Sequence, residues 1–291
     1  MSSSLLARAL SASALVLIPV LALGACSSAP TAAPGSAGAA SSTAAEDDAL
    51  AALRKSGVLK IGTEGTYAPF TYHDPVTNEL TGYDVEVISA LADKLGVAPE
   101  FAEAKWDAIF AGLEAGRYDL IANQVSVNDE RLARYDLSDT YATSIPVGVV
   151  AEDNTSIASV DDIAGLRGAH SATSNWAQIS KGAGARIEPV DGFTEAITAI
   201  RDGRVDYTIN DNLAVLDYLK STGDAGVKIA FELPERAVAQ AFALRKDSGL
   251  LDAINRALDE LRAEGALAKI SEKYFGEDVS APLTDSARSA K

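Results

Sequence analysis

Two charged side chains, far apart in the sequence, have the chemistry to bind the two ends of a small zwitterion. Arg131 carries a planar guanidinium that can hold a carboxylate through two parallel hydrogen bonds. Asp211 carries a carboxylate that can accept hydrogen bonds from an ammonium group. Together they predict a binding site for a ligand with both charges, such as an α-amino acid.

Other residues suit the same ligand. Thr173 and Ser174 stand at the start of an expected helix and offer backbone N–H groups to an anion, although they could simply cap that helix. Tyr67 and Trp106 can supply flat apolar walls. The remaining candidates are the hydrogen-bonding residues Glu64, Asn123, Gln124 and Ser126.

Each signal also has a purely structural interpretation. Asp211 is a common type of helix cap, and residues 128–131 (NDER) could be another cap that leaves Arg131 on the surface. Tyr67 and Trp106 could be ordinary core aromatics. Because all the candidates follow apolar runs expected to be strands, their shared position favours a site more than any one residue does.

The elements that must position these residues alternate between short apolar runs and amphipathic stretches. The run VLKIG at 58–62 predicts a strand, and the apolar spacing in 83–96 predicts a helix that ends at Gly96. A strand, a helix over 106–116 and a further strand follow. This βαβαβ succession predicts a parallel or mostly parallel sheet, with ligands bound beyond the carboxyl ends of its strands.

A second succession of the same kind follows the first, so the chain is expected to have two α/β lobes. The last two helices are too few to form a third domain and are expected to return to the first lobe. These patterns predict a first lobe of 49–145 and 236–276 and a second lobe of 146–235. The chain would cross between them near 143–147 and 233–238.

The first 25 residues have the pattern of a lipoprotein signal peptide. Residues 5–23 are mostly apolar, and the small pair Gly24-Ala25 precedes Cys26, as in a bacterial lipobox. This predicts cleavage before Cys26, lipidation of its sulfur, and anchoring to the outer face of a membrane. An ordinary signal peptide and an uncleaved transmembrane helix are the alternatives, and Pro19 and the short run disfavour the helix.

Residues 26–48, almost entirely Ser, Ala, Pro, Gly and Thr, predict a flexible tether, and 277–291 a disordered tail. Without residues 1–25, the chain has 24 Lys+Arg against 41 Asp+Glu, a net charge of −17. This charge argues against nucleic acid or an anionic membrane surface as a partner. One Cys and two His at unrelated positions predict no metal site, and no cofactor is expected.

Three stretches resemble the polar amino-acid family of ABC-transporter solute-binding proteins: 62–74 (GTEGTYAPFTYHD), 106–131 and 203–220. The resemblance covers roughly 57–276, and several runs look closest to members that bind cystine. It implies a two-lobed α/β fold of the type II periplasmic-binding-protein class, with a hinge of two crossing segments. Such a protein closes over one amino acid and, as a monomer, presents it to a membrane permease.

The resemblance also implies roles for individual residues. Arg131 would pair with the α-carboxylate of the ligand and Asp211 with its α-ammonium, while Ser126 and Thr173 bond the same head group. Glu64 stands where family members carry an acidic residue that meets the ligand side chain. Tyr67 and Trp106 would sandwich the ligand. The candidate partners for the second head group of a cystine are Glu64, Asn123, Gln124 and Asn175.

Two other functions stay open beside amino-acid capture for import. A dehydratase on the same fold needs a general acid or base; neither His73 nor His170 lies at an expected strand end with a partner, although Glu64 could serve. An amino-acid-sensing lipoprotein would bind ligand without a permease. The residues favour a binding protein that is not an enzyme.

Overall fold

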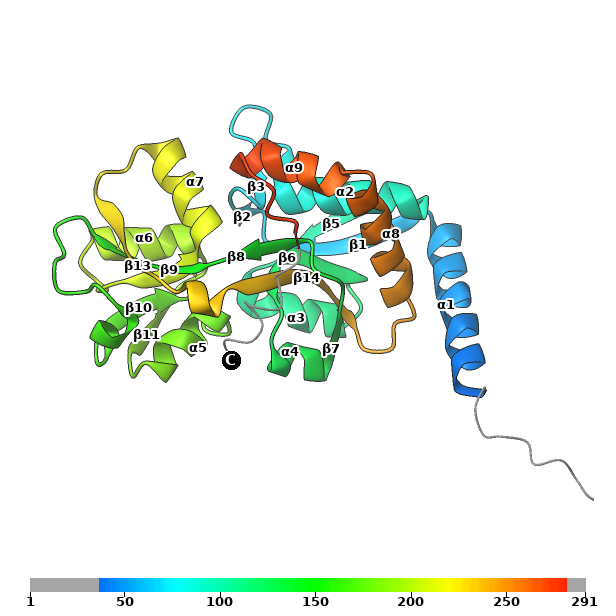
Figure 1. The fold of residues 1–291 in the computed structure, drawn as a ribbon, viewed down its shortest axis with the longest axis horizontal. Helices are drawn as coiled ribbons and strands as arrows, with labels where there is room; N and C mark the ends of the chain where they lie inside the picture. The colour runs from blue at the N-terminus through cyan, green and yellow to red at the C-terminus, as the bar shows by residue number, and fades with distance from the viewer. Residues whose placement is uncertain (1–36, 282–291) are drawn as a thin grey trace, which may run out of the picture. The chain divides into compact units, whose positions relative to one another are not determined.

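The computed structural model of the protein describes residues 37–281, which form two lobes of sheet and helix (Figure 1). The expected signal peptide and Cys26 lie outside the described residues. Within 37–281, no helix is long and apolar enough to cross a bilayer.

A six-stranded sheet forms the first lobe. Its strand order is β5-β1-β6-β14-β7, and β8 pairs with β14 as well. β1 runs parallel to β5 and β6, whereas β14 is antiparallel to β6, β7 and β8. The strands are β1 (Val58–Thr63), β5 (Ala98–Glu103), β6 (Leu120–Ser126), β7 (Tyr135–Leu137), β8 (Ala142–Ser144) and β14 (Val238–Arg245).

Helices cover both faces of this sheet because its strands are apolar on both sides. In β6, Leu120 and Ala122 pack into the core with α2 and α8, whereas Ile121 packs with Ile109 and Leu113 of α3 on the opposite face. The helices of this lobe are α2 (Tyr83–Leu95), α3 (Trp106–Glu114), α4 (Asp129–Arg134), α8 (Leu251–Ala263) and α9 (Ala266–Phe275).

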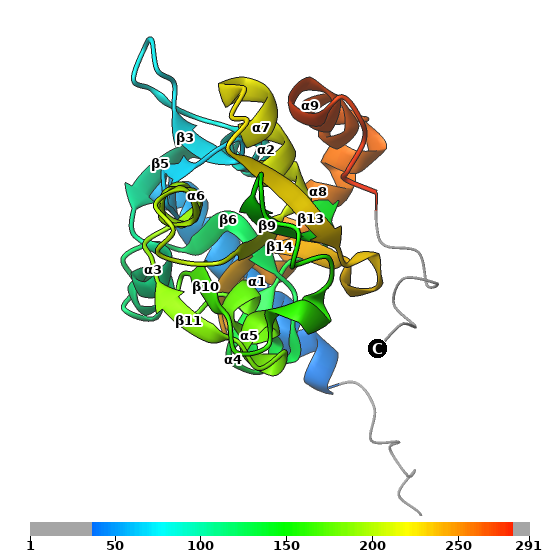
Figure 2. The same cartoon turned by 90° about the vertical axis from the view of Figure 1, so that its left-hand side faces the viewer.

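The second lobe combines an antiparallel sheet of order β12-β9-β13 with a parallel pair, β10 and β11. Figure 2 shows this lobe in front, with α6 and α7 packed on one face of β9 and α5 on the other. Its strands are β9 (Pro146–Ala151), β10 (Arg167–His170), β11 (Arg186–Pro189), β12 (Thr208–Asp211) and β13 (Val227–Glu232). Its helices are α5 (Asn175–Gly182), α6 (Phe193–Arg201), α7 (Asn212–Thr222) and the 3-10 turn Val160–Ile163.

The expectation of a mostly parallel second sheet was wrong, and the crossings explain why. β9 carries the chain away from the first lobe, whereas β13 must bring it back toward β14. Two neighbouring strands that run out and back are necessarily antiparallel. The crossings run from β8 to β9 through Ile145 and from β13 to β14 through the 3-10 turn Pro234–Arg236, and the Leu233 N–H bonds the Pro146 carbonyl at 2.9 Å.

Both ends of the folded region are more ordered than their composition suggested. Helix α1 (Ala37–Ser56) begins inside the stretch expected to be a tether, because its alanines favour helix and Leu53 is buried in the core of the first lobe. The prediction of a disordered tail over 277–291 is also wrong for its first residues. Val279 and Ser280 are buried, and the Val279 carbonyl accepts from the Thr143 N–H at 2.8 Å.

Candidate functional site

A cavity lies between the two lobes, where β1, β6 and β12 end. Its volume is about 510 Å³, including the part open to solvent. Eight of the residues predicted for the site line it: Glu64, Tyr67, Trp106, Asn123, Gln124, Ser174, Asn175 and Asp211. The other lining residues are Thr66, Ser171, Trp176, Gly192, Phe193 and Asn210.

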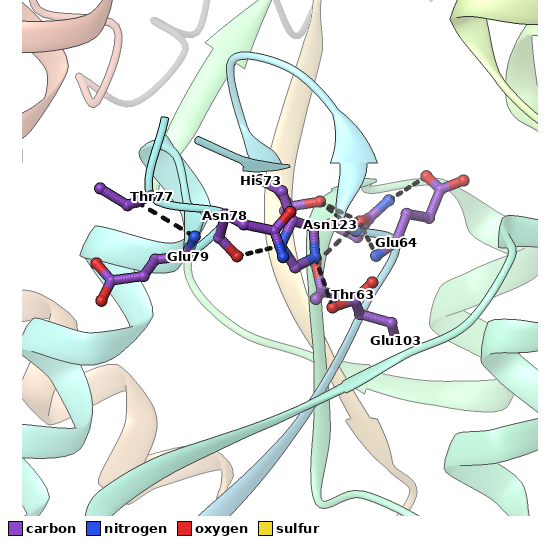
Figure 3. A network of polar contacts seen from close by, with 10 residues as sticks. Thr63, Glu64, His73, Thr77, Asn78, Glu79, Glu103 and Asn123 are labelled. Carbon is purple, nitrogen blue, oxygen red and sulfur yellow. Dashed lines mark hydrogen bonds and ion pairs between the residues drawn. The ribbon is translucent and has the colours of Figure 1, made fainter. Parts of the chain in front are cut away.

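Asn123 fixes the position of Glu64 at one side of this cavity (Figure 3). Its amide nitrogen donates to Glu64 Oε2 at 2.6 Å, and its amide oxygen accepts from the Glu64 N–H at 2.8 Å and the Thr63 hydroxyl at 3.1 Å. Burial raises the pKa of the Glu64 carboxyl to about 7, with smaller contributions in the same direction from Asp107 and Glu195. Glu64 is therefore poised to change its charge when a cation approaches.

A small three-stranded sheet, β2 (Thr66–Tyr67), β3 (Thr71–His73) and β4 (Leu80–Thr81), brings Tyr67 to the cavity. His73 ties this sheet to β5 through Glu103 Oε1 at 2.8 Å, and its other ring nitrogen bonds the Asn78 carbonyl at 2.9 Å within the loop between β3 and β4 (Figure 3). The Tyr67 hydroxyl donates to Asn210 of the second lobe at 2.6 Å. Tyr67 thus contacts both lobes, as the wall of an interlobe site must.

Asp211 lies at the opposite side of the cavity and is fully buried. Its carboxylate caps α7 by accepting from the Leu213 N–H at 2.9 Å, so the capping interpretation is correct as well. It also accepts from the Ser144 hydroxyl and, at 3.5 Å, from the Gln240 amide. Burial raises the pKa of Asp211 to about 7.

Ser144 and Gln240 belong to the two strands that lead into the crossings between the lobes, so Asp211 is bonded to both hinge segments. Sequence reasoning missed these two residues. They lie 67 and 29 residues from Asp211, and only the folded chain brings the three together.

Arg131 is buried, so the interpretation of a solvated surface arginine was wrong. Only 7% of the residue is exposed. Its guanidinium lies over the Trp106 ring at 5.0 Å and donates to the Ser126 carbonyl at 2.7 Å. The side chain of Asn128 caps α4, as the sequence suggested, by accepting from the Arg131 N–H at 2.9 Å.

Within residues 47–281, no carboxylate forms an ion pair with Arg131. Burial lowers the pKa of Arg131 to about 10, which still leaves it charged at neutral pH. The guanidinium lines a second cavity between the lobes, together with Asp107 and Thr173, rather than the one lined by Asp211. Its expected pairing with a ligand carboxylate stays a prediction.

Thr173 and Ser174 already have partners within the protein. The N–H and hydroxyl of Thr173 bond Asp107, at 3.0 and 2.7 Å. The Ser174 hydroxyl accepts from the Ala177 N–H at 3.1 Å, and so caps α5. Ser126, by contrast, keeps a buried hydroxyl with no hydrogen-bond partner among the described residues. The ligand contacts expected of these three residues stay predictions.

Gln124 owes its place in the cavity wall to a buried carboxylate that sequence reasoning overlooked. Asp84 is fully buried and accepts from the Gln124 backbone N–H at 2.7 Å and from its side-chain amide at 2.6 Å. These bonds hold Gln124 at a φ of 50°, a conformation uncommon for residues other than glycine. The position of Asp84 in the first turn of an ordinary helix gave no signal of this role.

The cavity lined by Glu64 and Asp211, called the main cavity from here on, carries charges that favour a cationic group. Glu64 and Asp211 are the charged residues among those described as lining it, and they come from different lobes. Two carboxylates in a site of low polarity attract ammonium groups, whose binding would lower both pKa values. No group of metal-ligating side chains is found within the described residues.

The raised pKa of Glu64 predicts how the stability of the wild-type protein depends on pH. Its folded pKa, about 7, exceeds the ordinary value of 4.5, so between these values the folded state holds a proton that the unfolded state has lost. The contribution of Glu64 to stability therefore falls as pH rises from 4.5 to 7. We expect the free energy of unfolding of Glu64→Gln to exceed that of the wild type by roughly 1 to 3 kcal/mol at pH 8, and by much less at pH 5.

Urea unfolding of both proteins at pH 5 and pH 8 measures this difference. Glu79→Gln, at an exposed carboxylate, is the matched control and should show the same difference from wild type at both pH values. Equal stability of Glu64→Gln and wild type at pH 8 would show that burial does not perturb Glu64.

Comparison with known proteins identifies the family of the chain. The chain matches the model of the bacterial extracellular solute-binding proteins, family 3, over residues 59–277. It is 47% identical, over 266 residues, to the L-cystine-binding protein TcyA of Bacillus subtilis, a match that covers 91% of this chain and 96% of that protein. It is also 35% identical, over 241 residues, to the L-cystine-binding protein TcyJ of Escherichia coli, a match that covers 81% of this chain and 89% of that protein.

Solved structures also resemble it. The L-cystine solute receptor of Neisseria gonorrhoeae, in an unliganded open conformation, is 45% identical with a TM-score of 0.55, covering 80% of this chain and 99% of that one. An ancestral arginine-binding protein bound to arginine is 36% identical with a TM-score of 0.70, and the match covers 76% of this chain and 99% of that one. The fold is the two-lobed type II fold of periplasmic binding proteins. The chain belongs to the bacterial extracellular solute-binding proteins, family 3.

Proposed function

We propose that the protein captures L-cystine in the cavity between its lobes and delivers it to an ABC permease. The observation that carries this proposal is the pair of buried carboxylates, Glu64 and Asp211, one from each lobe, facing one cavity. The 47% identity to an L-cystine-binding protein supports the choice of ligand.

Cystine has two α-amino-acid head groups and therefore two ammonium groups. One ammonium binds Asp211 and the other binds Glu64, so each buried carboxylate acquires the opposite charge that offsets its burial. A ligand with a single ammonium leaves one carboxylate without a cation. Arginine and lysine also carry two cationic groups, and they are the competing ligands that a test must include.

Arg131 completes the site by binding a ligand carboxylate. Its guanidinium is stacked on Trp106, which lines the main cavity, and its Nη1 is held by the Ser126 carbonyl, while no carboxylate of the described residues pairs with it. A ligand carboxylate held between the lobes would accept from the guanidinium N–H groups of Arg131 that do not bond the Ser126 carbonyl. Ligand contacts from both lobes then favour the closed arrangement, and the hinge segments absorb the motion.

A thermal-shift screen of the proteinogenic amino acids and L-cystine tests the ligand. We expect L-cystine to give the largest rise in Tm, with arginine and lysine well below it and neutral amino acids near zero, because binding only to the folded state stabilises it. Recovery of L-cystine unchanged after incubation would separate binding from catalysis. A rise with arginine and none with L-cystine would contradict the assignment.

Removing the guanidinium should abolish binding without unfolding the protein. We expect Arg131→Met, which keeps an apolar chain against Trp106, to raise the Kd for L-cystine at least about 100-fold, as for a buried charge that loses its partner. Calorimetry measures the Kd, and thermal unfolding checks the fold. The control is Arg134→Ala, which removes an exposed arginine paired with Glu114 and should bind as wild type does. Near-native affinity of Arg131→Met would refute the assigned role.

We further propose that the protein is lipidated on Cys26 and held at the outer face of the membrane. Its expected lipobox and the Ala- and Ser-rich segment after it support anchoring. In cells, Cys26→Ser should move the protein from the membrane fraction to the soluble exported fraction and reduce uptake of labelled L-cystine. Wild-type protein whose mass shows an unmodified Cys26 would rule out the lipid anchor.

A further inference from the structure

A carboxylate of the first lobe accepts hydrogen bonds from three donors of the second lobe. Asp107, the second residue of α3, accepts from the Ala172 N–H at 3.1 Å, the Thr173 N–H at 3.0 Å and the Thr173 hydroxyl at 2.7 Å. Both donor residues belong to the turn between β10 and α5. Hydrogen bonds to an ionised acceptor are stronger than those between neutral groups, so this contact can contribute to holding the lobes together.

The contact is well placed to report on the cavity. Asp107 directly follows Trp106, which lines the main cavity, and Asp107 itself lines the second cavity beside Arg131 and Thr173. Movement of the turn at 172–173 away from Asp107 would therefore separate the two lobes next to the residues proposed to hold the ligand head group.

Other polar contacts between the lobes involve fewer donors. Lys105 pairs with Asp191 where both side chains are more than half exposed, and Gln178 donates once to Glu130 at 2.7 Å. Exposed single pairs contribute little because water competes for both partners. The bonds of Asp107 are also exposed, but they differ in number, because two backbone N–H groups and a hydroxyl converge on one carboxylate that has no ion pair within the described residues.

We propose that Asp107 is a positioning residue whose hydrogen bonds from Ala172 and Thr173, together called the clasp, hold the lobes together. The clasp raises ligand affinity although Asp107 does not touch the ligand. This inference rests on the proposed function in one respect, that the lobes close over L-cystine. The Thr173 N–H then acts in closure through Asp107 instead of bonding the ligand.

The effect on affinity follows from a two-state equilibrium between open and closed lobes. Ligand is held by the closed state, so the observed Kd rises as the closed fraction falls. Losing the clasp lowers the closed fraction and speeds opening. The affinity lost should therefore appear in the dissociation rate, while the association rate changes little.

The charge of Asp107 has a second effect, which opposes the first. Its carboxylate contributes to the raised pKa of Glu64, alongside Glu195 and the larger effect of burial. Removing Asp107 therefore eases ionisation of Glu64 and strengthens its attraction for an ammonium group. A loss of affinity on removing Asp107 therefore cannot come from Glu64, and the exchange rates of the Ala172 and Thr173 amides decide whether it comes from the clasp.

The test compares Asp107→Ala and Asp107→Asn with the wild-type protein. We expect Asp107→Ala to raise the Kd for L-cystine about ten-fold, mostly through faster dissociation. The Kd of Asp107→Asn should lie between those of the wild type and Asp107→Ala, because its amide oxygen can still accept hydrogen bonds. Stopped-flow fluorescence gives the two rates. The control is Asp93→Ala, which removes an exposed carboxylate from α2 and should leave the Kd within two-fold of wild type.

Hydrogen exchange of the Ala172 and Thr173 amides, measured by NMR without ligand, gives a second readout. Asp107→Ala should speed their exchange and Asp93→Ala should not. If wild type binds no L-cystine, the ligand assignment fails, and the exchange result alone decides whether the clasp exists. The clasp is refuted if these amides exchange at wild-type rates in Asp107→Ala. It is also refuted if Asp107→Ala binds L-cystine as tightly as wild type, or more tightly because Asp107 competes for the same N–H groups.

Discussion

The burial of the Asp211 carboxylate at the junction of the lobes is the constraint on which the site depends. A carboxylate removed from water is tolerated only when donors surround it, and here the donors come from the start of α7 and from both segments that cross between the lobes. The same bonds therefore place Asp211 in the cavity and tie it to the hinge. An ammonium group that binds Asp211 acts on a group already bonded to the parts of the chain that must move.

Glu64, Asp84 and Arg131 extend this pattern. Asp84 has all its partners inside the protein and serves to hold Gln124, so its burial is structural. Glu64 and Arg131 are only partly satisfied, one by an amide and the other by a carbonyl and an aromatic face. Incomplete pairing of a buried charge costs free energy, and natural proteins retain such groups where a ligand can complete them. This distinction separates the residues that support the site from those proposed to bind.

Local patterns in the sequence were enough to predict the strands, the helices and the strand-end position of most site residues. Apolar periodicity and helix-ending glycines are short-range signals, and Glu64, Trp106 and Asp211 lie directly beside them. What could not be predicted depends on contacts between distant segments: the antiparallel course of β9, the partners of Asp211, and the burial of Arg131 under Trp106. Composition also misled at both ends, because helix propensity in α1 and the packing of Val279 outweighed low complexity.

The lobes must meet specifically but not too strongly, since a protein that stays closed cannot take up or release its ligand. The contacts between the lobes fit this requirement. They are hydrogen bonds of single side chains, and they range from the part-buried bond of Tyr67 to Asn210 to the exposed bonds of Asp107 to the turn at 172–173. Apolar contact across the boundary is limited, with Tyr67 packed against the cores of both lobes and Leu213 and Ala214 of α7 joined to the core of the first. Because polar contacts exchange readily with water, the lobes can part at modest cost, and a ligand that supplies the missing charges can decide the equilibrium.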